Sequence, residues 1–287
     1  MTIKSILCIF EGSQEELGAV NAAFLLAKTF RANIRFLHIS QSPSNYIGVY
    51  EDGIVIRQEL ILSIDEENRI RMDKAKELVR LLADRHLVPL DIKEYVNHHA
   101  SAHFIHHSGD PDIIIGKEGI ASDIIVLGSS IKDGNIMAAL FNTGRPVLLL
   151  PQIDGIAPHE LQDKVISISW DSSMEAARAI FNAMPILKKA EKIHLLTACK
   201  SGKIDENLNA YNPIIKYLFE HGLKPDHIII DPENHTVAET ILNKAKELKS
   251  NLLVMGAYSH SRFREIILGS FTRDMLEKSD IPLLLSH

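Results

Sequence analysis

Similar short apolar segments occur in the same order in the first and the second half of this chain. Residues 123–128 (DIIVLG) are matched by residues 251–256 (NLLVMG), and residues 145–150 (RPVLLL) are matched by residues 281–285 (IPLLL). Each segment is a short, continuous apolar run, which is typical of a strand buried on both faces of a parallel sheet. This repetition predicts a tandem duplication, and it restricts the chain to two copies of one α/β unit.

Strand and helix patterns alternate through both halves. In the first half they predict strands at 5–10, 33–39, 102–107, 123–128 and 145–151, and helices at 15–30, 61–86, 110–118 and 135–141. In the second half they predict strands at 164–170, 192–197, 227–230, 252–255 and 281–285, and helices at 175–187, 204–221, 236–248 and 262–277. Because a strand, a helix and a following strand form a right-handed βαβ unit, we expect two open, parallel, five-stranded sheets with helices on both faces. Ser13 is placed as the N-cap of the first helix, and residues 41–53 are predicted to form a loop.

The boundary between the halves is predicted at residues 152–163, which show no periodicity. We therefore expect a first domain at 1–151, a linker at 152–163 and a second domain at 164–287. The loop that follows the strand-ending glycine is eight residues shorter in the first half (128–146) than in the second (256–282). The two copies are therefore not expected to carry the same site.

Composition and charge exclude several classes of function. The chain has 31 basic and 37 acidic residues, a net charge of −6 and no basic cluster, so nucleic acid is not expected as a partner. Cys8 and Cys199 both lie in strand-like runs, which favours buried thiols in a reducing compartment over a disulfide. No run of about 18 apolar residues occurs, so we expect no membrane span, no secretory signal and a cytoplasmic location.

The candidate site lies where two strands of the second half end. In an open parallel sheet, ligands bind at the carboxyl ends of the strands, at the point where the strand order reverses. Asp171 follows the first strand of the second half and Gly256 ends the fourth, so both are expected at that edge. Backbone N–H groups at Gly256, Gly269 and Ser270 can meet phosphate oxygens, and the hydroxyl of Ser270 can contact a divalent ion. Taken alone, Gly256 is more typical of a tight turn and Asp171 of a helix N-cap, but their combination with Gly269 and Ser270 is more specific.

The loop carries a resemblance to a known family. Gly256, two residues, Ser259, nine residues, Gly269 and Ser270 resemble the nucleotide loop of the universal stress protein family, in which glycine stands at the position of Ser259. The segment from Val165 to Asp171 is also similar to that family, as is 109–111 (GDP) in the first half. The resemblance covers both halves, and it implies two tandem flavodoxin-like (Rossmann-like) domains. It also implies a stress-response function and, in some members, binding of ATP or another adenine nucleotide, with Mg²⁺ as a possible companion.

The resemblance also implies a role for each matched residue. Asp171 would contact adenine or ribose, Ala198 would lie against the base, and the phosphate would be held by Gly256, Ser259, Gly269, Ser270, Phe271 and Thr272. No catalytic residue and no metal ligand is assigned. Because the Cβ of Ser259 restricts φ where the family has glycine, it narrows the approach of a phosphate.

The first half departs from the family pattern. Glu11 stands in the place of Asp171, and the nine-residue spacer is missing after Gly128. We therefore predict that the first half does not bind ATP in the manner of the family. The closing strands at 147–150 and 283–285 are short and apolar, and we expect them to pair within the chain, with a homodimer as a further possibility.

Two other classes of function remain open. A Mg²⁺-dependent ATPase is one, although no Walker lysine follows the loop and no paired base is evident. The other is a scaffold without nucleotide that binds a protein, small ligand or metal through the enlarged first half. The histidines at 98, 99, 103, 106 and 107 could converge on a metal only if that segment were helical. We read it as a strand, for which a solvated edge is the better interpretation.

Overall fold

The computed structural model describes residues 2–40, 42, 48–50, 53–55, 58–91, 99–131, 133–152, 165–199, 213–257 and 270–287. The chain divides into two compact units. The first unit spans Ile3–Thr143, and the second spans Gly144–His287 together with Thr2. In the described part of the chain, none of the helices has the length and apolar character needed to cross a bilayer.

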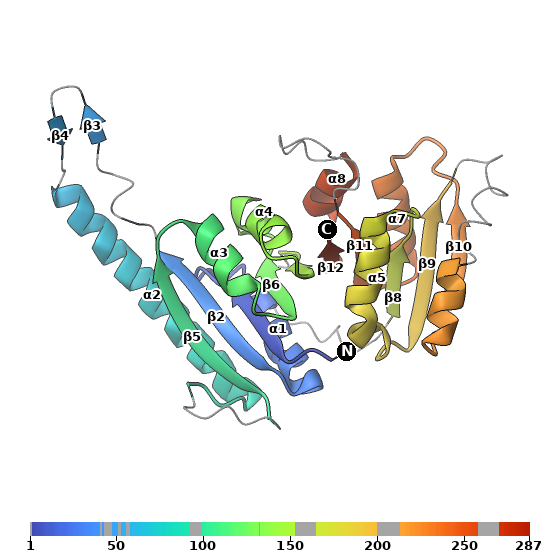
Figure 1. Cartoon of the computed structure of the whole chain (residues 1–287), viewed down its shortest axis with the longest axis horizontal. Coiled ribbons are helices and arrows are strands. Elements are labelled where there is room, and N and C mark those ends of the chain that lie inside the picture. The colour runs from blue at the N-terminus through green and yellow to red at the C-terminus, as the bar shows by residue number, and fades with distance from the viewer. Residues whose placement is uncertain are drawn as a thin grey trace. The chain divides into compact units, whose positions relative to one another are not determined.

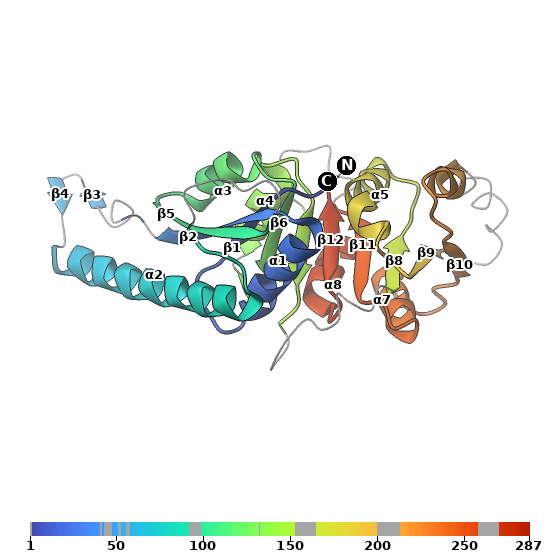
Figure 2. The same cartoon turned by 90° about the horizontal axis from the view of Figure 1, so that it is seen from below.

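The first unit is built on parallel strands in the order β6-β1-β2-β5. These strands are β1 (Ser5–Ile9), β2 (Asn33–Ser40), β5 (Ser101–Ser108) and β6 (Ile124–Gly128). The helices α1 (Leu17–Phe30) and α2 (Gln58–His86) cover one face, whereas α3 (Pro111–Gly119) and α4 (Asp133–Phe141) cover the other (Figures 1 and 2). Strands β1 and β6 are almost fully buried, as their continuous apolar sequences predicted.

The second unit repeats this plan, with strands in the order β10-β9-β8-β11-β12 and all of these neighbours parallel. The strands are β8 (Val165–Ser169), β9 (Lys192–Ala198), β10 (Asp226–Ile230), β11 (Leu252–Gly256) and β12 (Leu283–Ser286). Helix α5 (Met174–Leu187) lies on one face, and α7 (Val237–Glu247) and α8 (Ser270–Lys278) lie on the other (Figure 2). A further helix covers 213–220. The predicted α/β fold with mostly parallel strands and helices on both faces is therefore confirmed.

The strand β7 (Val147–Leu150) belongs to the second unit, although it precedes the predicted linker. It pairs antiparallel with β12, with Leu148 opposite Leu284 and Leu149 opposite Leu283. All four residues of each strand are buried. The expected pairing of the two closing strands is thus observed. The linker prediction falls mostly on residues outside the described ranges.

Helix α2 differs from the other helices of the first unit in its burial. Within residues 61–86 the first buried residue is Ala75. Ion pairs between side chains three or four positions apart run along this stretch: Glu66 with Arg69, Arg69 with Asp73, and Glu67 with Arg71. Such pairs, between exposed side chains, give weak support to a helix stretch that lacks a packed face.

Two local predictions were wrong. The loop predicted at 41–53 contains the short strand β3 (Gly48–Tyr50), which pairs antiparallel with β4 (Gly53–Val55) at the end of that segment. Ser13 is not the N-cap of α1, because the helix begins at Leu17 and Glu16, which makes no side-chain capping hydrogen bond, stands at the cap position. The carboxylate of Glu16 instead accepts hydrogen bonds from the backbone N–H groups of Glu11 and Ser13, at 3.2 and 3.0 Å.

Candidate functional site

The candidate site lies at the carboxyl ends of β8, β9 and β11 in the second unit. The chain leaves β8 toward β9 on one side, while β11 lies on the other, so the strand order reverses between β8 and β11. Ser169 of β8 is paired with Leu196 of β9, and Ile168 of β8 is paired with Val254 of β11. Continued by two residues, these registers set Asp171 beside Ala198, and Trp170 beside Gly256. The fold therefore brings three predicted site residues, Asp171, Ala198 and Gly256, to one edge, which is where α/β sheets bind ligands.

Asp171 is exposed, and one of its two carboxylate oxygens accepts a hydrogen bond within the protein. Its Oδ1 accepts a hydrogen bond from the backbone N–H of Ser173 at 3.0 Å. Ser172 between them has a φ of 64°, in the left-handed region. The N-cap of α5 is Ser173, whose hydroxyl accepts from the N–H of Ala176 at 3.1 Å. Asp171 therefore shapes the turn but is not the cap, and the described residues engage only its Oδ1.

Beside Asp171, two side chains carry buried polar atoms without partners. Trp170 is 8 % exposed and Thr197 is 3 % exposed. The indole Nε1 of Trp170 and the hydroxyl Oγ1 of Thr197 are both closed off from solvent, and neither has a hydrogen-bond partner. A buried polar group in this condition costs about 1–3 kcal/mol. Ala198, the next residue, is half-buried at the end of β9.

Gly256 has a packing role in this structure. A Cβ added at Gly256 would lie 2.5 Å from the backbone nitrogen of Ala176 and 2.6 Å from the carbonyl carbon of Glu175. The first turn of α5 thus rests directly on the end of β11, and only glycine leaves room for it. The next residue, Ala257, is also engaged: its N–H donates to the carbonyl of Ser286 at 2.8 Å, and its carbonyl lies 3.1 Å from Nδ1 of His287.

The phosphate-binding residues predicted from the sequence are described only in part. Ser259 and Gly269 lie outside the described residues. Ser270 is exposed and begins α8, Phe271 is half-buried, and Thr272 is 3 % exposed. The described part of α8 begins at Ser270, directly after the residues that the structure leaves undescribed. The burial of Thr272 gives no support to a direct contact with a ligand.

The equivalent place in the first unit is filled by a carboxylate. Glu16 is 2 % exposed, and its Cα and Cγ would both lie 3.5 Å from a Cβ added at Gly128. Burial raises the pKa of Glu16. The hydrogen bonds that its carboxylate accepts from Ser13 and Glu11 lower this pKa and offset part of the increase. The side chain of Glu11 is engaged as well, since its Oε1 accepts from Nδ2 of Asn135 at 3.1 Å. Sequence reasoning missed Glu16, because nothing in the local pattern shows that its side chain folds back over the turn.

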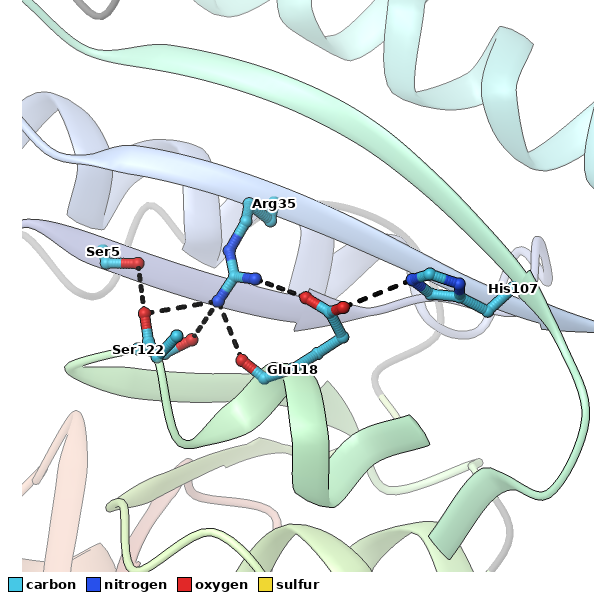
Figure 3. Close-up of polar contacts among 6 residues, drawn as sticks. Ser5, Arg35, His107, Glu118 and Ser122 are labelled. Atoms are coloured by element: carbon cyan, nitrogen blue, oxygen red, sulfur yellow. Dashed lines mark hydrogen bonds and ion pairs between the residues drawn. The ribbon is translucent and has the colours of Figure 1, made fainter. Parts of the chain in front are cut away.

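Three histidines of the cluster at 98–107, namely His103, His106 and His107, lie on a strand, as predicted. His103 and His107 are on β5, and His98 lies outside the described residues. His107 Nε2 is 3.3 Å from Glu118 Oε1, and the other oxygen of Glu118 accepts from Arg35 Nη1 at 2.5 Å. Arg35 also donates to the backbone carbonyl of Glu118 and to the hydroxyl of Ser122 (Figure 3). This network fixes the end of α3 to β2. Within the described residues, no group of three or more His, Cys, Asp or Glu side chains is arranged to hold a metal.

Buried histidines elsewhere are kept neutral by their surroundings. His38 is 3 % exposed, and its Nδ1 lies 3.1 Å from the carbonyl oxygen of Phe10. Burial lowers the pKa of His38, and the nearby His106 and Arg71 lower it further. Ser40 Oγ is 2.9 Å from Nε2 of His106, so the two rings and this hydroxyl form one polar cluster at the ends of β2 and β5. The cluster is internal to the first unit.

The chain is similar in sequence and in fold to known universal stress proteins. The sequence profile of the universal stress protein family matches residues 170–287. A universal stress protein of Synechocystis sp. is 25 % identical over 300 aligned residues, which cover 98 % of this chain and 99 % of that protein. A universal stress protein of Methanocaldococcus jannaschii is 30 % identical over 86 residues, which cover 30 % of this chain and 51 % of that protein. The crystal structure of a universal stress protein from Archaeoglobus fulgidus superposes with a TM-score of 0.68 at 16 % identity, covering 98 % of this chain and 97 % of that one.

Proposed function

We propose that this chain, a tandem two-domain member of the universal stress protein family, binds an adenine nucleotide such as ATP in its second unit. The observation that carries the proposal is the meeting of Asp171, Ala198 and Gly256 at the edge where the strand order reverses. The free oxygen of Asp171 would accept a hydrogen bond from the base or the ribose. Ser270, at the N-terminus of α8, would face the phosphates.

The two units differ in a way that supports one site per chain. In the first unit the buried carboxylate of Glu16 already accepts the N–H groups of the turn after β1. A second anion at that turn would be repelled by it and would find those donors engaged. In the second unit, Ala176 occupies the equivalent position and carries no charge. Glu175, next to Ala176, is also buried, but its carboxylate lies 3.6 Å from the guanidinium of Arg178, which offsets its charge.

Hydrolysis is expected to be slow at most. The described cations of α8 are engaged in ion pairs, Arg273 with Glu277 and Lys278 with Glu239. Among the described residues at this edge, no side chain is placed as a general base toward a phosphate. The protein would therefore act as a nucleotide binder in a stress response. Mg²⁺, if required, would be bound together with the phosphates. A cytoplasmic location remains a prediction.

Nucleotide binding can be read directly from this protein, because Trp170 is its single tryptophan and stands next to Asp171. Titration with ATP, with and without MgCl₂, should change the emission of Trp170 in a saturable manner, and calorimetry should give the same Kd. Asp171→Asn keeps the oxygen that accepts from Ser173 but removes the charge, and it should weaken binding by at least about tenfold. The matched control, Glu11→Gln in the first unit, should leave the Kd unchanged. Absence of both a fluorescence change and heat with the wild-type protein would refute the proposal.

A further measurement separates a binder from an ATPase. Purified protein with ATP and Mg²⁺ should release phosphate no faster than a Gly269→Val variant. Release that is rapid in the wild-type protein and lost in the variant would instead assign an ATPase. Small molecules set free by denaturing the purified protein, identified by mass spectrometry, should include the bound nucleotide.

A second candidate function is a scaffold, and the exposed part of α2 favours it. In residues 61–74 none is buried, Leu62 is 69 % exposed and Ile70 is 55 % exposed. Acidic residues at 65–67 precede basic residues at 69, 71 and 74. Two copies of α2 in antiparallel orientation would set each acidic run against the basic run of the partner, so the surface complements a second copy of itself.

Charge reversal tests this self-association. By light scattering, the wild-type protein should be dimeric, and both Glu66→Lys/Glu67→Lys and Arg69→Glu/Arg71→Glu should be monomeric. A mixture of the two variants should dimerise again, because the reversed charges of one complement those of the other. A wild-type monomer, or a dimer unaffected by either variant, would exclude this mode.

A further inference from the structure

Trp170 and Thr197 lie next to each other at the carboxyl ends of β8 and β9. The register that pairs Ser169 with Leu196 sets these two residues side by side in its next step, and the backbone N–H of Trp170 donates to the carbonyl of Leu196 at 2.9 Å. Residues paired across adjacent strands point to the same face of a sheet, about 5 Å apart. The two unpartnered polar atoms, Trp170 Nε1 and Thr197 Oγ1, therefore belong to one small region.

These two unsatisfied atoms lower the stability of the free protein, and they make no hydrogen bond that would offset this cost. Valine at 197 would fill nearly the same space with no polar atom to satisfy, and phenylalanine at 170 would keep an aromatic ring without the unsatisfied N–H. Sites where a chain keeps unsatisfied buried polar groups are typical of function rather than of packing. The same edge carries Asp171, the next residue after Trp170.

We propose that Trp170 and Thr197 hydrogen-bond the base of the nucleotide and so determine which nucleotide the second unit accepts. This inference rests on the proposed function. An indole N–H can only donate, whereas a hydroxyl can donate or accept. The matching ligand must therefore present an acceptor to Trp170 and a second polar atom to Thr197, as the edge of a purine does with its ring nitrogens and exocyclic group. A phosphate is a poor match, because neither side chain carries a positive charge.

Both atoms are closed off from solvent in the described structure, so the base reaches them only when side chains at this edge rearrange. Nucleotide binding would then satisfy two donors that are unsatisfied in the free protein. The unliganded protein and the complex should thus respond in opposite directions when these groups are removed.

The test uses Trp170→Phe and Thr197→Val in the full-length protein. Thr197→Val should raise the Tm of the free protein by roughly 2–4 °C, since an unsatisfied buried hydroxyl is replaced by a methyl group. Trp170→Phe should lower the Tm by less than its lost ring volume alone would cost, because it also removes an unsatisfied N–H. Each should also weaken ATP binding about fivefold to tenfold in calorimetry. Binding of inorganic tripolyphosphate, which has no base, should be unchanged.

A matched control is Thr240→Val in α7. Thr240 is 7 % exposed, but its hydroxyl donates to the carbonyl of Thr236 at 2.9 Å. This variant should lower the Tm and leave the affinity for ATP unchanged. If a trapped water satisfies Trp170 and Thr197, their variants will behave like this control, and the inference is overturned.

The remaining outcomes separate this inference from the proposed function. If the wild-type protein binds ATP but Trp170→Phe and Thr197→Val bind it equally well, only the inference about the base fails. If both variants weaken ATP and tripolyphosphate alike, the effect is not on the base, and the inference fails as well. If the wild-type protein binds no nucleotide at all, both proposals fall together.

Discussion

Replacement of the two strand-ending glycines by alanine should have opposite effects on stability. At Gly256, the new Cβ would meet two backbone atoms of α5, at 2.5 and 2.6 Å, and the Cβ of Glu175 at 2.8 Å. At Gly128, the nearest atoms would be 3.5 Å away, which is ordinary van der Waals contact. Neither glycine has a positive φ. The two positions therefore differ in packing and not in backbone strain.

The magnitudes follow from two terms. Alanine restricts the unfolded chain more than glycine does, which stabilises the protein by about 0.4–1 kcal/mol at both positions. At Gly256 the overpacking opposes this gain and typically costs about 1–3 kcal/mol, and the upper part of that range applies because backbone rather than a flexible side chain must move. We expect Gly256→Ala to lose roughly 1–2 kcal/mol of unfolding free energy. Gly128→Ala should gain up to about 1 kcal/mol.

Urea unfolding can resolve this difference. The fluorescence of Trp170 reports the second unit, and far-UV circular dichroism follows both units. With an m value of about 2 kcal/mol/M, the midpoint of the second unit should fall by roughly 0.5–1 M in Gly256→Ala. The Gly128→Ala midpoint should stay level or rise. Equal stability of Gly256→Ala and the wild-type protein, or an equal loss in both variants, would refute the packing argument.

Three further predictions concern single side chains. Burial raises the pKa of Glu16. The contribution of this side chain to stability is therefore complete below its unfolded pKa of about 4.3 and is lost as pH rises through the folded pKa. Glu16→Gln should remove this pH dependence in urea unfolding between pH 4 and 8. Burial lowers the pKa of His38, so its contribution is present above about pH 6.5 and is lost as pH falls through the folded pKa. His38→Leu should flatten the Tm of the first unit in that range, at a lower overall value because the carbonyl of Phe10 loses its partner; an unchanged pH profile would contradict this. Thr236 and Glu239 form a capping box at α7. Thr236→Ala should lower the unfolding free energy of the second unit by about 1 kcal/mol. A loss smaller than the error of the measurement would show that the cap is redundant.

The sequence predicted the elements that bury continuous apolar surface. Strands such as β6 and β11 were found because all or nearly all of their residues face the interior, and such runs are visible without knowledge of their partners. The strands β3 and β4 were missed, since three residues each are too few for an alternating pattern.

The reasons behind individual residues depended on contacts that are distant in sequence. Gly256 was predicted as a phosphate residue, but its requirement for glycine comes from α5, about 80 residues earlier. Ser13 was placed as a cap from local preference, and the carboxylate of Glu16 overrode that preference. The same holds for Trp170 and Thr197, whose missing partners become visible only when the neighbouring strands are in place.

The pairing of β7 with β12 means that the second sequence repeat and the second folded unit begin at different residues. By sequence the second copy begins near residue 164, yet β12 has its antiparallel neighbour at Val147–Leu150. A polypeptide that starts at residue 164 would carry the buried strand Leu283–Ser286 as a bare edge, and an uncovered apolar edge recruits strands from other molecules. A polypeptide that starts at Gly144 keeps its cover. The shorter fragment should be less stable than the longer one in urea unfolding, because residues 144–163 belong to the first repeat by sequence but to the second unit by folding.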